Sequence, residues 1–216
     1  ERGFGVDLDA PDHELRALFA GETCALGWLA ATVDRGFGDR RPGARPSFQP
    51  GSMAPERAGA LANGAGARRG ATGLDRMCGT GGILLGAGLV GADVLGMDAQ
   101  AKMTAGAREN FRALLDGDWS VFRGDAASLP VADDALDAVV FDAPYGRQSK
   151  IRGELGTLVG DALAEASRVA PRCVVVGDRP WARPAGAAGW QTEAAFSRRV
   201  HRSLTRYIVV LRRRER

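Results

Sequence analysis

The pattern of hydrophobic and polar positions becomes regular about a third of the way along the chain. From about residue 70 onward, short apolar runs alternate with longer amphipathic segments. The short runs predict strands, because each is brief, rich in apolar residues and bounded by turn residues. They cover 72–75, 93–98, 119–125, 136–144 and 172–178. Strands that alternate with helices predict an α/β fold with a parallel sheet.

The intervening segments predict helices. Residues 83–92 are mostly apolar, and the next segment places Met103, Ala107, Phe111 and Leu114 on one face. A third amphipathic helix is expected around 155–169. The chain closes with strand-like runs at 192–200 and 205–211, and a link this short requires an antiparallel pair. The predicted fold is a doubly wound, mostly parallel seven-stranded sheet with an antiparallel C-terminal hairpin.

The first 50 residues do not show this alternation of strand and helix patterns. Residues 13–33 fit either two strands with a turn at Ala20-Gly21-Glu22 or a helix interrupted by glycine, and we favour the hairpin. Residues 36–53 are rich in Gly, Pro and Arg and read as irregular. We therefore expect an N-terminal extension over 1–35, a linker and pre-sheet segment over 36–69, and the α/β domain over 70–216.

The composition excludes several classes of protein. No segment is apolar for long enough to cross a membrane, and no signal peptide is visible. The three cysteines lie far apart and the chain has two histidines, so neither a disulfide framework nor a zinc site is supported. We expect a protein without metal in a reducing, cytoplasmic setting.

The charge is mildly positive and consists almost entirely of arginine. The net charge is +3, and Lys102 and Lys150 are the lysines of the chain. Arginine forks suit phosphate oxygens, and the arginine-rich end at 197–216 favours a nucleic-acid partner. A GC-rich genome and a solvated basic tail explain the same composition equally well. Charge alone does not decide between them.

A glycine-rich turn and four acids point to a cofactor. The stretch "LDRMCGTGG" at 74–82 joins a strand to a helix, although Leu84 takes the third glycine position of the dinucleotide fingerprint. Four successive strands end in acids: Asp75, Asp98, Asp125 and Asp142. Parallel strands deliver these acids to one rim of the sheet, where open α/β sheets bind ligands. One such acid could be a helix cap, but four are better explained by a nucleoside-type cofactor.

The motifs "DRMCGTGG", "GMDAQ", "GDAASLP" and "DAPYG" resemble, in this order, those of class I S-adenosylmethionine-dependent methyltransferases. The chain resembles the archaeal tRNA (guanine(10)-N(2))-dimethyltransferases more closely still, through "RPSFQPGSM", "FDAPYGRQSKI", "VVVGDRPW" and "HRSLTR". Members of that family carry an RNA-binding THUMP domain ahead of the catalytic domain, so residues 1–35 resemble its trailing edge. Arg76 and Ser47 depart from the family pattern, which has proline and phenylalanine there.

The resemblance implies a role for each site residue. Asp142 would accept hydrogen bonds from the amine of the target base, Pro144 would fix the turn, and Tyr145 would stack on the flipped base. S-adenosylmethionine would be the cofactor and tRNA the partner, with the protein a monomer. The cofactor-binding residues would be Phe48, Gln49, Ser52, Asp75, Cys78, Gly79, Thr80, Gly81, Asp98, Ala99, Asp125 and Ala126. The RNA-binding residues would be Arg147, Gln148, Lys150, Arg199 and Arg202.

Three alternatives stay open at this point. The same chemistry could act on rRNA, on adenine in DNA or on a protein glutamine, although those last two families mostly show Asn-Pro-Pro-Tyr, against Asp142 and Ala143 here. The chain could instead be a cofactor-binding RNA module without activity. A dehydrogenase is a distant alternative, because the third glycine and a suitably placed histidine are lacking.

Overall fold

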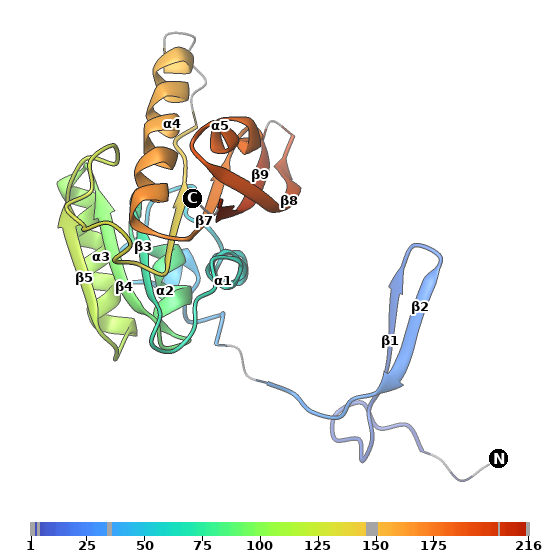
Figure 1. Ribbon diagram of the computed structural model, residues 1–216. Coiled ribbons are helices and arrows are strands. Elements are labelled where there is room, and N and C mark those ends of the chain that lie inside the picture. Colours follow the sequence, from blue (N-terminus) through green and yellow to red (C-terminus); the bar gives the residue numbers. More distant parts are fainter. Residues whose placement is uncertain (1–2, 4, 34–35, 146–150, 203, 215–216) are drawn as a thin grey trace. The chain divides into compact units, whose positions relative to one another are not determined.

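The computed structural model describes residues 3, 5–33, 36–145, 151–202 and 204–214. The chain divides into two compact units, residues 1–36 and 37–216, and each is described by itself (Figure 1). The predicted RNA-binding residues Arg147, Gln148 and Lys150 lie outside the described residues. In the part of the chain that is described, no helix combines the length and the apolar character that a membrane span needs.

The smaller unit contains a β-hairpin. Strands β1 (Leu15–Ala20) and β2 (Thr23–Trp28) pair antiparallel, and Gly21 takes a positive φ of 59° in the turn between them. This confirms the hairpin and excludes the interrupted helix. Its large apolar side chains are exposed, with Phe19 at 77%. Because a two-stranded hairpin is marginally stable by itself, this unit has little to hold it together internally.

The larger unit is built on a seven-stranded sheet in the order β5-β4-β3-β6-β7-β9-β8. Strands β3 to β7 pair in parallel, whereas β9 is antiparallel to both β7 and β8. The bounds are β3 (Thr72–Asp75), β4 (Asp93–Asp98), β5 (Trp119–Arg123), β6 (Ala138–Asp142), β7 (Arg172–Gly177), β8 (Trp190–His201) and β9 (Leu204–Arg213). The predicted fold class is confirmed in strand number, direction and C-terminal hairpin.

Helices cover both faces of this sheet (Figure 1). Apolar side chains of α1 (Pro55–Gly64), α2 (Gly82–Gly88) and α3 (Ala101–Leu114) pack on one face. Side chains of α4 (Ile151–Val169) and α5 (Ala182–Ala187) pack on the other face, around Phe141, Val139 and Val175. Burial of these apolar surfaces is the main force that holds the layers together. The central strands are covered on both sides, as their continuous apolar runs predict.

Two helices were not anticipated from the sequence. Helix α1 lies within 36–69, which was expected to be linker and pre-sheet segment, and α5 follows β7. Helix α1 begins at Pro55, whose fixed φ suits the first helical position. A short 3₁₀ helix at Pro42–Ala44 is the one regular element among the described residues between 37 and 53.

Candidate functional site

Three carboxyl side chains line one cleft at the carboxyl ends of the parallel strands. Asp75, Asp98 and Asp142 end β3, β4 and β6, which are neighbours in the sheet. The cleft has a volume of about 270 Å³. Its other lining residues are Gln49, Gly51, Ser52, Met53, Met77, Cys78, Gly79, Thr80, Gly82, Ile83, Gln100 and Met103. The cleft therefore lies where open α/β sheets bind their ligands.

The glycine turn after β3 is tied to β4 by its backbone. The Gly79 N–H donates to Asp98 Oδ2 at 3.0 Å, and the Cys78 N–H donates to the Met97 carbonyl at 2.9 Å. The Gln100 N–H donates to Asp98 Oδ1 at 2.9 Å. Asp98 does not cap the helix that follows it, because Gln100 occupies the N-cap of α3 and no side chain caps that helix. The capping alternative thus fails for Asp98.

Asn110 on α3 joins the segment before the sheet to the glycine turn. Its Nδ2 donates to the carbonyl oxygens of Ser47 at 2.7 Å and of Thr80 at 2.8 Å. Its Oδ1 accepts from the Ser47 N–H at 2.9 Å. Asn110 is fully buried, so each of these bonds satisfies a group that cannot reach water. The bonds hold the segment that carries Gln49 and Ser52 against the cleft.

Asp142, Tyr145 and Arg206 form a connected polar group at the edge of the cleft. The Tyr145 hydroxyl donates to Asp142 Oδ1 at 2.6 Å, and Arg206 Nε donates to the Tyr145 oxygen at 2.9 Å. Arg206 Nη2 lies 3.7 Å from Asp142 Oδ2 and also donates to the Gly51 carbonyl at 3.4 Å. Asp142 Oδ2 therefore faces a positive charge without a short hydrogen bond from it. That oxygen can accept a bond from a ligand.

Burial sets the acidity of two of the cleft carboxyls. The pKa of Asp142 is raised because the side chain is largely removed from water, while the bond from Tyr145 and the charge of Arg206 pull it back down. Burial raises the pKa of Asp75 to about 8, against a weaker lowering by the Met77 N–H at 3.1 Å. The nearby carboxyls of Asp142 and Asp98 raise it further. Asp75 thus keeps its proton to a higher pH than an ordinary aspartate does.

We expect the free energy of unfolding to fall as pH rises between about 4 and 8, partly through Asp75. The folded protein keeps the Asp75 proton up to a pKa of about 8, whereas the unfolded chain releases it near the ordinary value of 3.8. Because the folded state binds the extra proton in that window, raising the pH destabilises it. Urea unfolding at several pH values should give a shallower dependence for Asp75→Asn than for the wild type. Asp93→Asn, at the exposed start of β4, is the control, and equal slopes for Asp75→Asn and the wild type would contradict the assignment.

Arg76 points away from the cleft and into the core. Its Nη1 donates to the Ala162 carbonyl on α4, and its guanidinium carbon lies 5.7 Å from the Phe141 ring centroid. The side chain is 1% exposed, and burial lowers its pKa to about 10. Among the described residues, its Nε and Nη2 have no hydrogen-bond partner. The departure from the family proline therefore places a charge beneath the site and adds no side chain to the cleft.

Seven of the twelve predicted cofactor-binding residues line the cleft: Gln49, Ser52, Asp75, Cys78, Gly79, Thr80 and Asp98. Gly81, with a φ of 82°, belongs to the glycine turn but does not line the cleft. Phe48 is half-exposed and does not line it. Ala99, Asp125 and Ala126 lie beyond it as well, and Asp125 Oδ1 accepts from the Ala127 N–H at 2.9 Å. The binding roles of all these residues stay predictions.

Among the residues predicted to act on the base or the RNA, Asp142 lines the cleft and Tyr145 bonds to it. Pro144, Arg199 and Arg202 are exposed. Their catalytic and RNA-binding roles stay predictions.

Sequence reasoning missed several residues of the cleft. The side chains of Met53, Met77, Ile83, Gln100 and Met103 line it beside the acids. Arg206 belongs to the arginine-rich end at 197–216 that was expected to favour a nucleic-acid partner, yet it is 6% exposed and contacts Tyr145. The alternation of side chains along β9 could have indicated this position. Arg206, Ile208 and Val210 lie two residues apart and therefore share one face of the strand.

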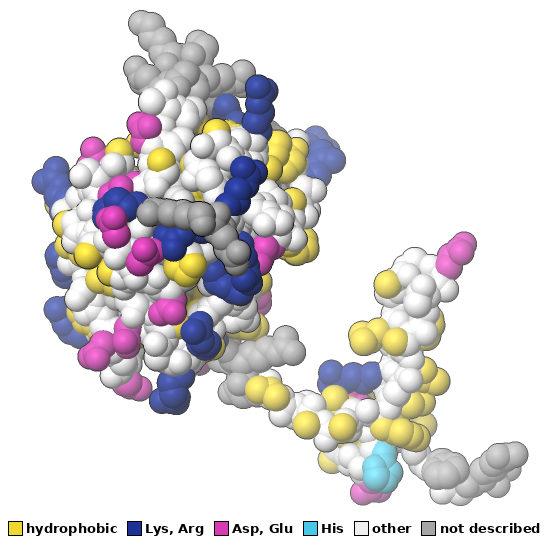
Figure 2. Space-filling view, viewed as in Figure 1, with side chains coloured by type: hydrophobic (Ala, Val, Ile, Leu, Met, Phe, Trp, Pro, Cys, Tyr) yellow, Lys and Arg dark blue, Asp and Glu magenta, His cyan; other side chains and the backbone are white. Residues whose placement is uncertain are grey.

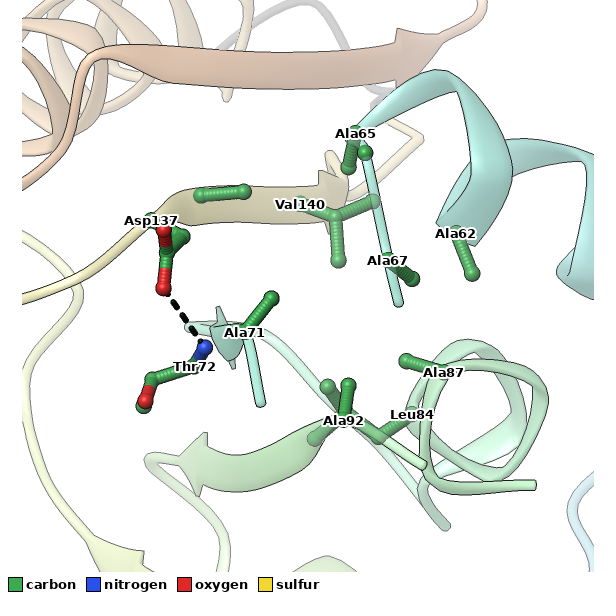
Figure 3. A pocket seen from close by; sticks show the side chains of 13 residues that line it. Ala62, Ala65, Ala67, Ala71, Thr72, Leu84, Ala87, Ala92, Asp137 and Val140 are labelled. Atoms are coloured by element: carbon green, nitrogen blue, oxygen red, sulfur yellow. Dashed lines mark hydrogen bonds between the residues drawn. The ribbon is translucent and has the colours of Figure 1, made fainter. Parts of the chain in front are cut away.

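A smaller cavity lies at the amino ends of the parallel strands, away from the cleft at their carboxyl ends. It has a volume of about 20 Å³ and is lined mostly by alanine, with Leu84 and Val140 (Figure 3). The Thr72 N–H donates to Asp137 Oδ2 at 2.8 Å beside it, at the amino ends of β3 and β6. Its size and its apolar walls leave room for little beyond a water molecule. This cavity is a packing feature of the sheet and not a ligand site.

Known proteins resemble this chain in sequence over nearly its whole length. The curated tRNA (guanine(10)-N2)-dimethyltransferase of Methanothermobacter thermautotrophicus is 35% identical over 99% of the chain and 65% of its own length. The protein of the same name from Pyrococcus abyssi is 30% identical, over 99% of the chain and 66% of its own length. The chain therefore spans slightly less than two thirds of the length of these relatives.

Solved structures share the fold. TrmN from Thermus thermophilus superposes with a TM-score of 0.65 at 25% identity, over 96% of this chain and 61% of that one. A putative RNA methyltransferase from Pyrococcus horikoshii gives a TM-score of 0.57 at 20% identity, over 74% and 83% of the two chains. The predicted Rossmann-like methyltransferase fold is confirmed.

A family model covers most of the larger unit. Residues 42–208 match the model described as "RMKL-like, methyltransferase domain", and this range includes the cleft, Asp142, Tyr145 and Arg206. The match agrees with the motif order found in the sequence and with the curated relatives. The chain belongs to the RMKL-like methyltransferase domain family (UPF0020).

Proposed function

We propose that this protein transfers methyl groups from S-adenosylmethionine to the exocyclic N2 amine of a guanosine in tRNA, at position 10. The observation that carries the proposal is Asp142, whose Oδ2 is available as an acceptor at the rim of the cleft. The names of the curated relatives support the choice of substrate. We further propose that residues 70–216 are the catalytic domain, that 36–69 close over the cofactor, and that 1–35 adjoin an RNA-binding region. We place the protein in the cytoplasm.

The residues of the cleft fit S-adenosylmethionine. The ligand is a nucleoside that carries a sulfonium and an ammonium group, and three carboxyls line the cleft. Asp98 at the end of β4 suits the ribose hydroxyls, and Asp75 suits the ammonium group. The walls also supply apolar side chains from Met77, Ile83 and Met103. When bound, the cofactor supplies the electrophilic methyl group.

Asp142 would activate the amine. An exocyclic amine on a purine is a weak nucleophile, because its lone pair is delocalised into the ring. A carboxylate that accepts a hydrogen bond from the amine favours a pyramidal nitrogen and can take up the proton that the nitrogen releases. Oδ2 is the oxygen for this role, since the Tyr145 hydroxyl occupies Oδ1. The protein contributes position and electrostatics at that oxygen.

Tyr145 would hold the base. Its hydroxyl is fixed by Asp142 and Arg206, and the Arg206 guanidinium carbon lies 5.8 Å from the ring centroid. The ring is thereby oriented before any base arrives, which lowers the entropy cost of stacking. Pro144 would restrict the turn that carries it.

The test is transfer of labelled methyl from S-adenosylmethionine to an unmodified tRNA transcript, followed by nucleoside analysis. We expect N2-methylated guanosine at position 10, with excess DNA or a protein substrate failing to compete. A transcript in which position 10 is adenosine is the matched control. Methyl transfer that continues undiminished on this control, or labelled adenine in place of guanine, would refute the proposed substrate.

We expect Arg206→Ala to move the acid limb of the pH–rate profile to higher pH. The active form of Asp142 is the carboxylate, and Arg206 lowers the pKa that burial has raised. Without the guanidinium, the pKa of Asp142 rises further, so more of the protein is protonated and inactive at a given pH. The kcat/KM for tRNA measured against pH would show the shift. Arg206→Lys keeps the charge, so its acid limb should lie between those of Arg206→Ala and the wild type. Superimposable profiles for Arg206→Ala and the wild type would contradict the role of Arg206.

A further inference from the structure

A second hollow lies beside the cleft, between α1 and the strands β7, β9 and β8. We call it the β8–β9 groove, and its volume is about 460 Å³. Side chains two residues apart on each strand share its floor, as the period of a strand requires. Phe196, Arg198 and Val200 come from β8, and Arg206, Ile208 and Val210 come from β9. Phe196 is 60% exposed, so its ring is accessible to a ligand.

The groove adjoins the proposed reaction site. Met53 lines both the cleft and the groove. Arg206 lies in the groove and bonds to the Tyr145 hydroxyl at 2.9 Å. A polymer whose target base reaches Asp142 would therefore have its neighbouring residues at the entrance to the groove.

The groove combines an apolar floor with two arginines, Arg57 and Arg198, that lack acidic partners among the described residues. Arg57 on α1 and Arg198 on β8 form no ion pair among the described residues. Arg57 Nε is buried and, within the same part of the chain, has no hydrogen-bond partner. Arg198 is also the direct cross-strand neighbour of Arg206. Like charges directly opposite each other destabilise a sheet. Arg206 already faces Asp142, so Arg198 is the arginine of this pair that an anion in the groove would neutralise.

Charge on the face drawn in Figure 2 does not single out an RNA site. On the face drawn in Figure 2, Lys and Arg side chains are spread over the whole larger unit. The groove differs from such a surface because its arginines flank an exposed aromatic ring. Single-stranded RNA offers the matching chemistry, with bases that stack on aromatic rings and phosphates that pair with arginine.

We propose that the β8–β9 groove binds a nucleotide next to the target guanosine, with its base on Phe196 and its phosphates at Arg57 and Arg198. This subsite rests on the proposed function and extends it from the target base to the flanking strand. A second copy of the chain is a poorer occupant. A two-fold contact through this groove would bring the arginines of both copies together and repel.

The experiment measures binding of an unmodified tRNA transcript and, separately, the KM for that tRNA in methyl transfer. Phe196→Ala should weaken binding and raise KM roughly tenfold, and Phe196→Tyr should restore both. Arg198→Ala should weaken binding and reduce the salt dependence by about one phosphate contact. Leu89→Ala and Arg112→Ala remove an exposed apolar and an exposed basic side chain outside the groove and should change neither quantity. Cofactor affinity reports that each variant is folded.

The outcomes separate this inference from the proposed function. If tRNA binds, Phe196→Ala weakens it and no methyl is transferred, the groove is an RNA subsite and the proposed function fails. If methyl transfer proceeds and Phe196→Ala leaves both binding and KM unchanged, the inference is wrong and the function stands. A wild type that binds no tRNA overturns both. A concentration-dependent dimer that Phe196→Ala abolishes would assign the groove to self-association and overturn the inference.

Discussion

Asp142→Ala is expected to lower methyl transfer to tRNA by about 10²–10³-fold, the range found when one preorganised electrostatic contact of a reaction centre is removed. The alanine cannot accept a hydrogen bond from the amine or take up its proton. It also leaves the Tyr145 hydroxyl and Arg206 without the carboxyl that both now face. The loss should therefore appear in kcat as well as in kcat/KM.

Two variants separate this chemistry from a loss of structure. Asp142→Asn keeps the shape and one acceptor but cannot take up the proton, so it should stay well below the wild type. Asp93→Ala removes an exposed carboxyl at the other end of β4 and should retain full activity. Cofactor affinity, followed by calorimetry, shows whether the cleft remains intact. Full activity of Asp142→Ala with normal tRNA affinity would refute the assigned role.

Gly81→Ala is expected to have the largest effect on stability, roughly 2–5 kcal/mol from a left-handed backbone and an overpacked contact together. Gly81 has a φ of 82° at the N-cap of α2. A Cβ there would overlap the ring of Phe111, which is fully buried on α3. Relieving that overlap requires the buried Phe111 ring or the glycine turn to shift, and Asn110 on α3 bonds to that turn at Thr80. The same change should therefore abolish cofactor binding.

Gly79→Ala is the matched control for this prediction. Gly79 also has a positive φ, 53°, but a Cβ there would meet open space. Gly79→Ala should lower the free energy of unfolding only through the left-handed backbone, by about 1–2 kcal/mol. Urea unfolding of both variants isolates the contribution of the Phe111 contact, and Gly81→Ala combined with Phe111→Leu should recover part of the loss. Equal destabilisation by the two alanine variants would show that the overlap does not matter.

The parts of the fold that follow from local pattern could be predicted from the sequence. Strand β6 was recognisable from "AVVF" followed by Asp142, because a buried strand of a parallel sheet is apolar on both faces. Helix α1 was not, because its sequence "PERAGALANG" is rich in alanine and glycine and has only one large apolar side chain, Leu61. Its helical state depends on packing against α2 and the sheet, which no local pattern contains.

The candidate site also contains residues that local pattern predicts and residues that only the tertiary fold brings in. Asp75, Asp98 and Asp142 reach one cleft because adjacent parallel strands end at the same edge. Asp125 also follows a strand, but the residue is exposed and does not line the cleft, and its carboxyl accepts from the Ala127 N–H within its own turn. Arg206 is separated from Tyr145 by 61 residues, and only the tertiary fold brings them together.

The order of strands at the C-terminal edge has a consequence for the growing chain on the ribosome. Strand β8 is synthesised before β9, yet β9 lies between β7 and β8 in the sheet. The earlier strand must therefore wait, unpaired and with Phe196 exposed, until the later one has emerged and inserted beside β7. Arg206 arrives on that same inserting strand. The proposed reaction site would thus be completed only after β9 has emerged and paired with β7.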